Sequence, residues 1–430
     1  MMLLSLLTCV LLGALSAQAE VVQSFQNCKD FFYMGKEPTG MDENAQKICQ
    51  KYGNHPNPFF ATLYSEYHRI PLYSAYIFYG RTGSKQARST RWFIEPQVRF
   101  MTFSQGLSGF NKKNMSLESE FSSSAIKVNQ AINDDYKNTG YDRGHLNPAS
   151  YQVDDGRMAT FTLTNIAPED PCFNRVHWKD WETKLQDIIK GKLLADNHQA
   201  KAYLVTGTIP STSYRIPQTK VSQDDQRDLD RVTVPTHVWT ALCYKHETDN
   251  HKSFSIAFIG QNQPESNITV MSVQRLNFEL GNVSRQNQAV QIFFDDCFTN
   301  NKESKDVISS LEEKIQLPIS KKLKIALDSC QTQPSVPMAE NLCNSAKCKD
   351  DHPCDTHGHD SYWSEKASGS WDYCSLPLSE NIEKYQINYA CDKYCNNYYC
   401  YYALIIISIY FMYSICSCIR RSYTTGPLNA

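Results

Sequence analysis

The chain has 430 residues, enough for one large domain with smaller attachments or for two or three domains. With 41% hydrophobic and 20% charged residues it can build a packed core, which excludes disorder as its overall state. Its net charge of −2 excludes a general attraction to nucleic acid, so binding of nucleic acid would require a local basic patch.

Residues 1–19 have the pattern of a secretory signal peptide. An apolar run, Leu3–Leu15, is followed by Ala17-Gln18-Ala19, which is a cleavage motif of the A-x-A type. We expect cleavage after Ala19 and entry of the mature chain into the secretory pathway.

The cysteines and the glycosylation motifs agree with that route. The chain has 16 cysteines, and disulfides persist in oxidising compartments. N-x-S/T motifs stand at Asn114, Asn267 and Asn282. Cys9 leaves with the signal peptide, and two further cysteines fall in a C-terminal apolar segment. The remaining number is odd, which leaves one thiol free or paired with another molecule.

Residues 20–330 are predicted to form one mixed α/β body. Runs rich in β-branched and aromatic residues, bounded by turn residues, predict strands. These runs are Tyr73–Gly80, Arg91–Phe100, Ala159–Pro168, Ala202–Pro210, Thr236–Tyr244 and Ser253–Gly260. Helical periodicity is clear in Asn174–Leu194 and weaker in Asp306–Leu317.

The stretch "GYDRGHLNPASYQ" (140–152) places an acid, a base and an imidazole around a glycine. Taken alone it could be a solvated turn. The residues that follow predict a strand that ends at His145, a second strand that ends at Asn165, and a helix that begins near Asn174. This ββα order is typical of a metal-binding helix crossing under a hairpin.

The predicted helix carries Asn174, Trp178 and Glu182 at spacings of four residues, which puts them on one face. Eight residues rise about 12 Å, too far for Asn174 and Glu182 to share one small ion directly. A water between ion and carboxylate would bridge that gap, and Mg²⁺ keeps its waters readily. Trp178 is assigned to the core, with the other apolar residues of this helix.

The residue types suit phosphodiester hydrolysis. That reaction needs a base to deprotonate a water and positive charge beside the phosphate oxygens. His145 as a neutral imidazole suits the first task, and a hard cation with oxygen ligands suits the second. Arg143 can hold a phosphate oxygen.

Asp142-Arg143-Gly144-His145, "TNIAP" with Asn165, and Asn174 followed by Glu182 resemble the DNA/RNA non-specific endonuclease family. The resemblance implies an α+β fold, the ββα-metal (His-Me finger) nuclease with a central antiparallel sheet. It implies that His145 is the general base, that Asn174 is the direct ligand of Mg²⁺ or Mn²⁺, and that Glu182 orients water. It also implies that Asn165 belongs to the floor of the site and that Arg143 faces phosphate. Members cut DNA and RNA and leave 5′-phosphates.

The segment 64–113 is the candidate surface for the phosphate backbone of DNA and RNA. It holds eight basic residues and two acidic ones, which neutralise several phosphates only if the basic residues share a face. Scattering over a solvated surface is the alternative.

Cys172 lies two residues before Asn174, where a disulfide could fix or distort the metal ligand. His237 is interpreted as structural rather than catalytic. The cluster of His352 to Asp360 with its neighbouring cysteines mimics a zinc site, but disulfides are the better interpretation in an oxidising compartment.

From residue 331 the composition changes. Residues 331–400 are predicted to be a linker and a Cys-rich module held by disulfides, because so short a stretch has little core. Tyr401–Ile419 has no charged residue and is predicted to be a transmembrane helix. Arg420 and Arg421 open a short cytoplasmic tail, 420–430. The chain is therefore expected to be a single-pass type I membrane protein or a secreted one. A mispredicted C-terminus is the alternative.

A second function stays open beside nuclease activity. A membrane-anchored or secreted glycoprotein could keep a slow or inactive nuclease fold and use it as an interaction module. The presence of the base, the ligand and the carboxylate together argues against such decay.

Overall fold

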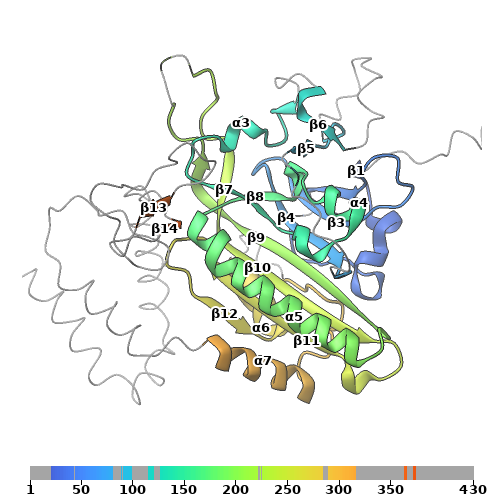
Figure 1. Cartoon of the computed structure of the whole chain (residues 1–430). Coiled ribbons are helices and arrows are strands. Elements are labelled where there is room, and N and C mark those ends of the chain that lie inside the picture. Colours follow the sequence, from blue (N-terminus) through green and yellow to red (C-terminus); the bar gives the residue numbers. More distant parts are fainter. Residues whose placement is uncertain are drawn as a thin grey trace, which may run out of the picture. The chain divides into compact units, whose positions relative to one another are not determined.

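The computed structural model describes residues 21–42, 44–80, 89, 91–98, 115–120, 126–220, 223, 225–283, 289–315, 363–365 and 371–373. Eight strands in this part form one antiparallel sheet in the order β1-β2-β3-β4-β9-β10-β11-β12 (Figure 1). Their bounds are β1 Val21–Val22, β2 Gln46–Gln50, β3 Phe60–Ser65, β4 Ile70–Ile77, β9 Ala200–Ile216, β10 Val232–His246, β11 Phe254–Gln261 and β12 Ile268–Met271. The prediction of a central antiparallel sheet is confirmed.

Successive side chains of each strand point to opposite faces of the sheet, and both faces are apolar. Leu204 and Leu242 belong to one buried cluster, whereas their neighbours Val205 and Cys243 belong to another. On the second face, Gly207 leaves room for the indole of Trp239, since a Cβ at this glycine would lie 2.3 Å from Trp239 Cζ2. Both faces therefore need a covering layer.

Helices supply those layers. α5 (Lys179–Ala195) and α7 (Lys302–Ile315) pack against the first cluster, and Figure 1 shows α5 in front of the long strands β9 and β10. The ring of Trp181 on α5 stacks on Phe258 of β11 at a centroid distance of 5.2 Å. A 3₁₀ helix, Phe25–Phe31, and α6 (Val273–Val283) pack against the second cluster.

A smaller unit beside the sheet holds the DRGH segment. β7 (Asp142–His145) pairs antiparallel with β8 (Ile166–Glu169), and α5 follows after a π-helical turn, Phe173–Trp178. This confirms the predicted ββα order. Around this pair lie the remaining short elements: β5 Phe93–Ile94, β6 Ser116–Leu117, α3 Asn133–Tyr136, α4 Asp154–Ala159, and 3₁₀ helices at Glu118–Glu120, Ala149–Tyr151 and Leu163–Asn165. The other 3₁₀ helices are Tyr33–Gly35 and Asn250–Lys252.

Two predicted strands were placed wrongly. The strand expected to end at Asn165 instead begins at Ile166, because Leu163–Asn165 forms a 3₁₀ turn whose side chains are buried. Of the strand expected over Arg91–Phe100 the structure describes residues 91–98, and within these only Phe93–Ile94 forms a strand, which pairs with β6. At these positions the β-branched and aromatic residues are buried without forming a long hydrogen-bonded strand.

Disulfides are present, as the cysteine content predicted. Cys28 pairs with Cys49, and Cys243 pairs with Cys297. Cys172 is also disulfide-bonded. The first two bridges tie the covering elements to the second face of the sheet.

The terminal predictions fall mostly outside the described residues. These include the signal peptide, the transmembrane helix Tyr401–Ile419 and the cytoplasmic tail. Within the described part, no helix combines the length and apolarity needed to cross a bilayer. In the predicted Cys-rich module the structure describes one hairpin, β13 (Trp363–Glu365) with β14 (Trp371–Tyr373). The boundaries at 331 and 400 stay predictions.

Candidate active site

The β7–β8 pair sets the register of the DRGH residues. Asp142 stands opposite Glu169, and His145 stands opposite Ile166. Because side chains alternate along a strand, Arg143 and His145 share one face of the pair, while Asp142 and Glu169 share the other. Gly144 lies under the Glu169 side chain, and a Cβ at this glycine would meet Glu169 Cδ at 2.0 Å. A glycine is therefore required at this position of the motif.

His145 and Arg143 lie among aromatic rings. The His145 imidazole is 5.5 Å from the Trp92 ring and 5.0 Å from the Phe161 ring, measured between centroids. The Arg143 guanidinium lies 5.3 Å from the Trp92 ring and 5.7 Å from the Tyr136 ring. Cation–π contacts of this kind orient a guanidinium without neutralising it. Both residues are half-buried, and His145 Nε2 is itself buried.

Asn165 is buried and fixes the backbone that follows His145. Its Oδ1 accepts hydrogen bonds from Ser74 Oγ at 2.9 Å and from the Asn147 amide at 3.0 Å. Its Nδ2 donates to the carbonyls of Asn147 at 3.1 Å and Thr160 at 3.0 Å. The carboxamide thus has all of its polar atoms engaged, and it ties the loop after His145 to strand β4.

Asn174 stands in the π-helical turn that precedes α5. Its Nδ2 donates to Asp142 Oδ2 at 2.8 Å, and Arg175 forms an ion pair with the same carboxylate. The backbone N–H of Asn174 donates to the Asp170 carbonyl oxygen at 2.8 Å. The backbone N–H of Cys172 donates to the Asp170 carboxylate at 2.9 Å. Asp142 therefore orients the Asn174 side chain, which leaves the Asn174 amide oxygen directed away from this carboxylate.

Glu182 lies in the first turn of α5 and is half-buried. Burial raises the pKa of its carboxyl to about 8, while Trp178 and Lys179 partly oppose the rise. Tyr151 donates its hydroxyl to the Glu182 carbonyl at 2.7 Å, which holds the start of the helix against the loop after DRGH. This carboxyl would be ionised more readily beside a cation.

The predicted single face of Asn174, Trp178 and Glu182 stays a prediction, and the residues Phe173–Trp178 form a π-helical turn. Trp178 is buried against Phe173 and Phe258 and also lowers the pKa of Glu182, so it lies close to that carboxyl. This agrees with its assignment to the core. The structure thus joins Arg143 with His145 through the Trp92 ring, and Asn174 with Asp142 through a hydrogen bond.

The oxygen donors fit a hard divalent cation. An amide oxygen and a carboxylate are ligands that Mg²⁺ and Mn²⁺ accept, with water completing the shell. Within the described ranges, no group of three or more His, Cys, Asp or Glu side chains has the geometry to hold a metal. A cation here would therefore rely on few protein ligands, a condition that Mg²⁺ tolerates.

The structure adds residues that the sequence did not indicate. Trp92 and Phe161 contact His145 from separate segments, and Arg175, the neighbour of Asn174, pairs with Asp142 of the DRGH motif. Glu169 and Asp142 stood inside the motifs, but their partners are fixed only by strand register. No local sequence pattern could have identified these contacts.

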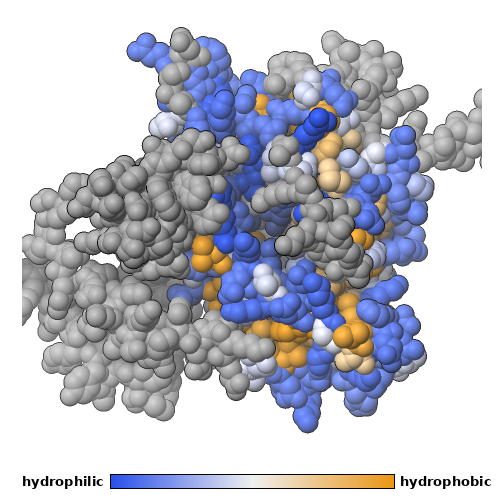
Figure 2. Space-filling view, viewed as in Figure 1, coloured by the Kyte–Doolittle hydropathy of each residue, from blue (hydrophilic) through white to orange (hydrophobic). Residues whose placement is uncertain are grey.

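The predicted basic surface is only partly described. Within the residues that the structure describes, Arg69 of the segment 64–113 donates to the carbonyls of Val128 and Arg231, so it stabilises a loop. Arg91 is exposed. The face seen in Figure 2 is largely hydrophilic where it is coloured, with small separate hydrophobic areas.

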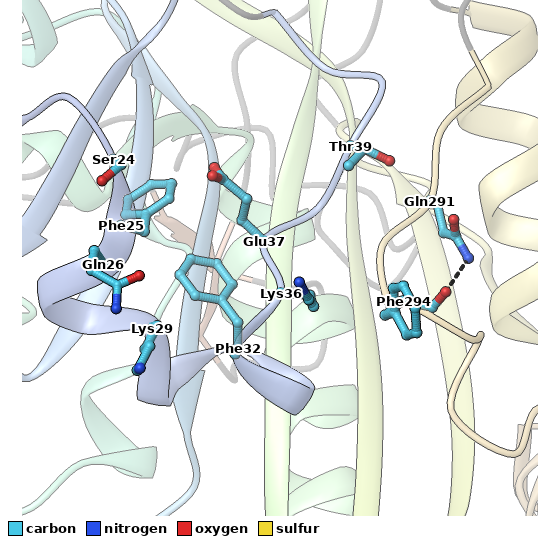
Figure 3. A pocket seen from close by; sticks show the side chains of 11 residues that line it. Ser24, Phe25, Gln26, Lys29, Phe32, Lys36, Glu37, Thr39, Gln291 and Phe294 are labelled. Atoms are coloured by element: carbon cyan, nitrogen blue, oxygen red, sulfur yellow. Dashed lines mark hydrogen bonds between the residues drawn. The ribbon is translucent and has the colours of Figure 1, made fainter.

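A separate pocket of about 280 Å³ lies on the other side of the sheet (Figure 3). It is lined by Phe25 and Phe32 of the second apolar cluster, with Lys29, Lys36 and Phe294 around them. It shares no residue with the DRGH site. We assign it no part in the chemistry.

A strand pair that carries DRGH, followed by a helix whose start presents an asparagine to that pair, defines a nuclease domain of the ββα class. A family model described as DNA/RNA non-specific endonuclease matches residues 41–297. The chain belongs to this family, which confirms the resemblance drawn from the motifs.

Three known proteins similar to this chain carry endonuclease or nuclease in their names. The human endonuclease domain-containing 1 protein is 34% identical over 221 residues, covering 51% of this chain and 39% of that protein. The mouse protein of the same name is 31% identical over 243 residues, covering 54% and 43%. The mitochondrial nuclease EXOG of Xenopus laevis is 24% identical over 180 residues, covering 41% and 46%. These matches thus span less than half of each relative.

Proposed function

We propose that the protein is a metal-dependent, non-specific endonuclease that hydrolyses phosphodiester bonds of DNA and RNA and leaves 5′-phosphates. The observation that carries the proposal is the pairing of β7 with β8 and the Asp142–Asn174 hydrogen bond. Together they place the half-buried His145 and the oriented side chain of Asn174 within one small unit. Family membership supports the same reaction.

His145 acts as the general base. Its imidazole packs against the rings of Trp92 and Phe161, so one ring orientation is retained. A neutral imidazole accepts the proton of the attacking water at neutral pH. Positioned proton transfer of this kind contributes about two to four decades of rate.

Arg143 binds a phosphate oxygen, and Asn165 positions the base. The guanidinium is held on the same face as His145 by the rings of Trp92 and Tyr136, and it remains cationic. Asn165 makes no direct contribution to the chemistry. It fixes the loop after His145 through the two polar atoms of its carboxamide.

Asn174 would hold a bound cation through its amide oxygen, and Glu182 would accept hydrogen bonds from water in the site. When bound, Mg²⁺ or Mn²⁺ would supply positive charge beside the phosphate and the leaving oxygen. The Asp142 carboxylate orients the ligand from behind, as partners of metal ligands commonly do.

We place the protein in the secretory pathway, as a single-pass type I membrane protein or a secreted one. Three observations support this localisation: the signal-like N-terminus, the disulfides, and the exposure of Asn267 and Asn282 in two N-x-S/T motifs. Both asparagines are accessible to a glycosyltransferase.

The test compares His145→Ala, Asn174→Ala and Glu182→Gln with the parent in nicking of supercoiled plasmid and cleavage of RNA across a Mg²⁺ titration. His145→Ala should lose about two to four decades at every metal concentration. Asn174→Ala should recover part of its activity at high Mg²⁺ or Mn²⁺, and Glu182→Gln should lie between them. The matched control is His198→Ala, because His198 is exposed in the turn after α5, and this variant should cut like the parent.

The alternative is an interaction module with a slow or inactive nuclease fold. The human and mouse relatives carry the name endonuclease domain-containing 1 protein, which does not by itself state an activity. If the parent and His145→Ala cut equally slowly in all metals while both remain folded, this alternative replaces the nuclease.

A further inference from the structure

Glu169 is a carboxyl group that the proposed mechanism leaves unexplained. It ends strand β8 opposite Asp142 and has no exposed surface. Among the residues that the structure describes, neither of its carboxylate oxygens has a hydrogen-bond partner. A buried polar group without a partner is unfavourable, and more so if it is charged. Some compensating group is therefore required.

The position of this carboxyl is fixed by the DRGH backbone. Its Cδ and Oε1 lie 2.0 Å and 2.4 Å from where a Cβ of Gly144 would stand. The side chain therefore folds over Gly144, on the face that Asp142 shares. That is the face on which Asp142 holds Asn174.

The charges around Glu169 are negative. Burial, then the carboxylates of Glu182 and Asp142, hold the pKa of Glu169 well above its usual range. Asp142 is compensated by Arg175 and Asn174, whereas within the described ranges neither Glu169 nor Glu182 has a comparable ion pair.

We propose that Glu169 is a further ligand of the divalent cation, adding a carboxylate to the site of Asn174 and Glu182. This rests on the proposed function, because it assumes a cation at Asn174. A proton on Glu169 would remove the charge but leave its oxygens without partners. A buried water would itself need two to four polar partners. A hard cation would both coordinate a carboxylate oxygen of Glu169 and offset the repulsion from Glu182.

The test measures Mn²⁺ binding by the full chain, by calorimetry and by electron paramagnetic resonance, so that it does not depend on cleavage. Glu169→Gln keeps the shape and removes the charge, and it should weaken Mn²⁺ binding about 10- to 100-fold. Gly144→Ala keeps the charge but displaces the carboxyl, so it should weaken binding in the same direction. Asp196→Asn removes a buried carboxylate at the far end of α5, where Asp196 pairs with Lys252, and should bind Mn²⁺ like the parent.

Three outcomes are distinguishable. Loss of affinity in Glu169→Gln and Gly144→Ala, with Asp196→Asn unchanged and the circular dichroism spectra alike, supports the proposal. If Asn174→Ala loses Mn²⁺ while Glu169→Gln keeps the parent affinity, the role of Glu169 is refuted and the metal site stands. If the parent itself binds no Mn²⁺, both the ligand and the metal-dependent function are refuted. Should Glu169→Gln or Gly144→Ala not fold, Glu169→Asp decides, because it keeps the charge but withdraws the carboxylate, so it should weaken Mn²⁺ binding; parent affinity in this variant refutes the role of Glu169.

Discussion

Removal of the Asn165 side chain tests how the floor of the site is built. Asn165→Ala deletes four hydrogen bonds, to Ser74, to the amide and carbonyl of Asn147, and to the carbonyl of Thr160. At about 1 kcal/mol net for each bond, the free energy of unfolding should fall by about 4 kcal/mol. Globular domains have free energies of unfolding of about 5–15 kcal/mol, so the variant should fold but lose a large part of that free energy.

Ser74→Ala is the matched control. Ser74 makes two of the buried bonds, to Asn165 at 2.9 Å and to Thr62 at 3.1 Å, so its loss should be about 2 kcal/mol. The single bond that Ser74 and Asn165 share should make the double variant about 1 kcal/mol more stable than the sum of the singles predicts. Equilibrium unfolding in urea, followed by tryptophan fluorescence, measures all four proteins. Strict additivity, or an Asn165→Ala loss no larger than that of Ser74→Ala, would refute this account of the network.

Two further predictions concern stability. The folded pKa of Glu182 is about 8 against an ordinary value of 4.5, so its carboxyl favours the folded state fully below pH 4.5 and that contribution is lost as pH rises toward 8. In EDTA, the melting temperature of Glu182→Gln should therefore exceed that of the parent at pH 8 and approach it at pH 4. Scanning fluorimetry measures both proteins. The same difference in melting temperature at both pH values would contradict the raised pKa of Glu182. Cys243 and Cys297 close a longer loop than Cys28 and Cys49, with sequence separations of 54 and 21 residues. Replacing each pair with alanine should lower the free energy of unfolding by about 4 and about 3 kcal/mol respectively, and the reverse order in urea unfolding would show that loop entropy does not decide it.

The sequence alone determined the elements whose signal is local. Runs of β-branched and aromatic residues bounded by turn residues identified the segments that became β9, β10 and β11, because the residue types that favour a strand stand within each segment itself. The periodic run from Asn174 identified α5. The motif from Asp142 to His145, with Asn165 and Asn174, identified the family because these residue types recur at characteristic spacing.

Only the tertiary structure decided which side chains meet. Ser74 reaches Asn165 across 91 residues, and Trp92 reaches His145 from a segment whose own pattern indicated a longer strand. The register of β7 with β8 put Glu169 over Gly144, which neither "DRGH" nor "IAPE" could show by itself. Such contacts join segments far apart in the chain, and their geometry is set by packing and strand register rather than by local preference.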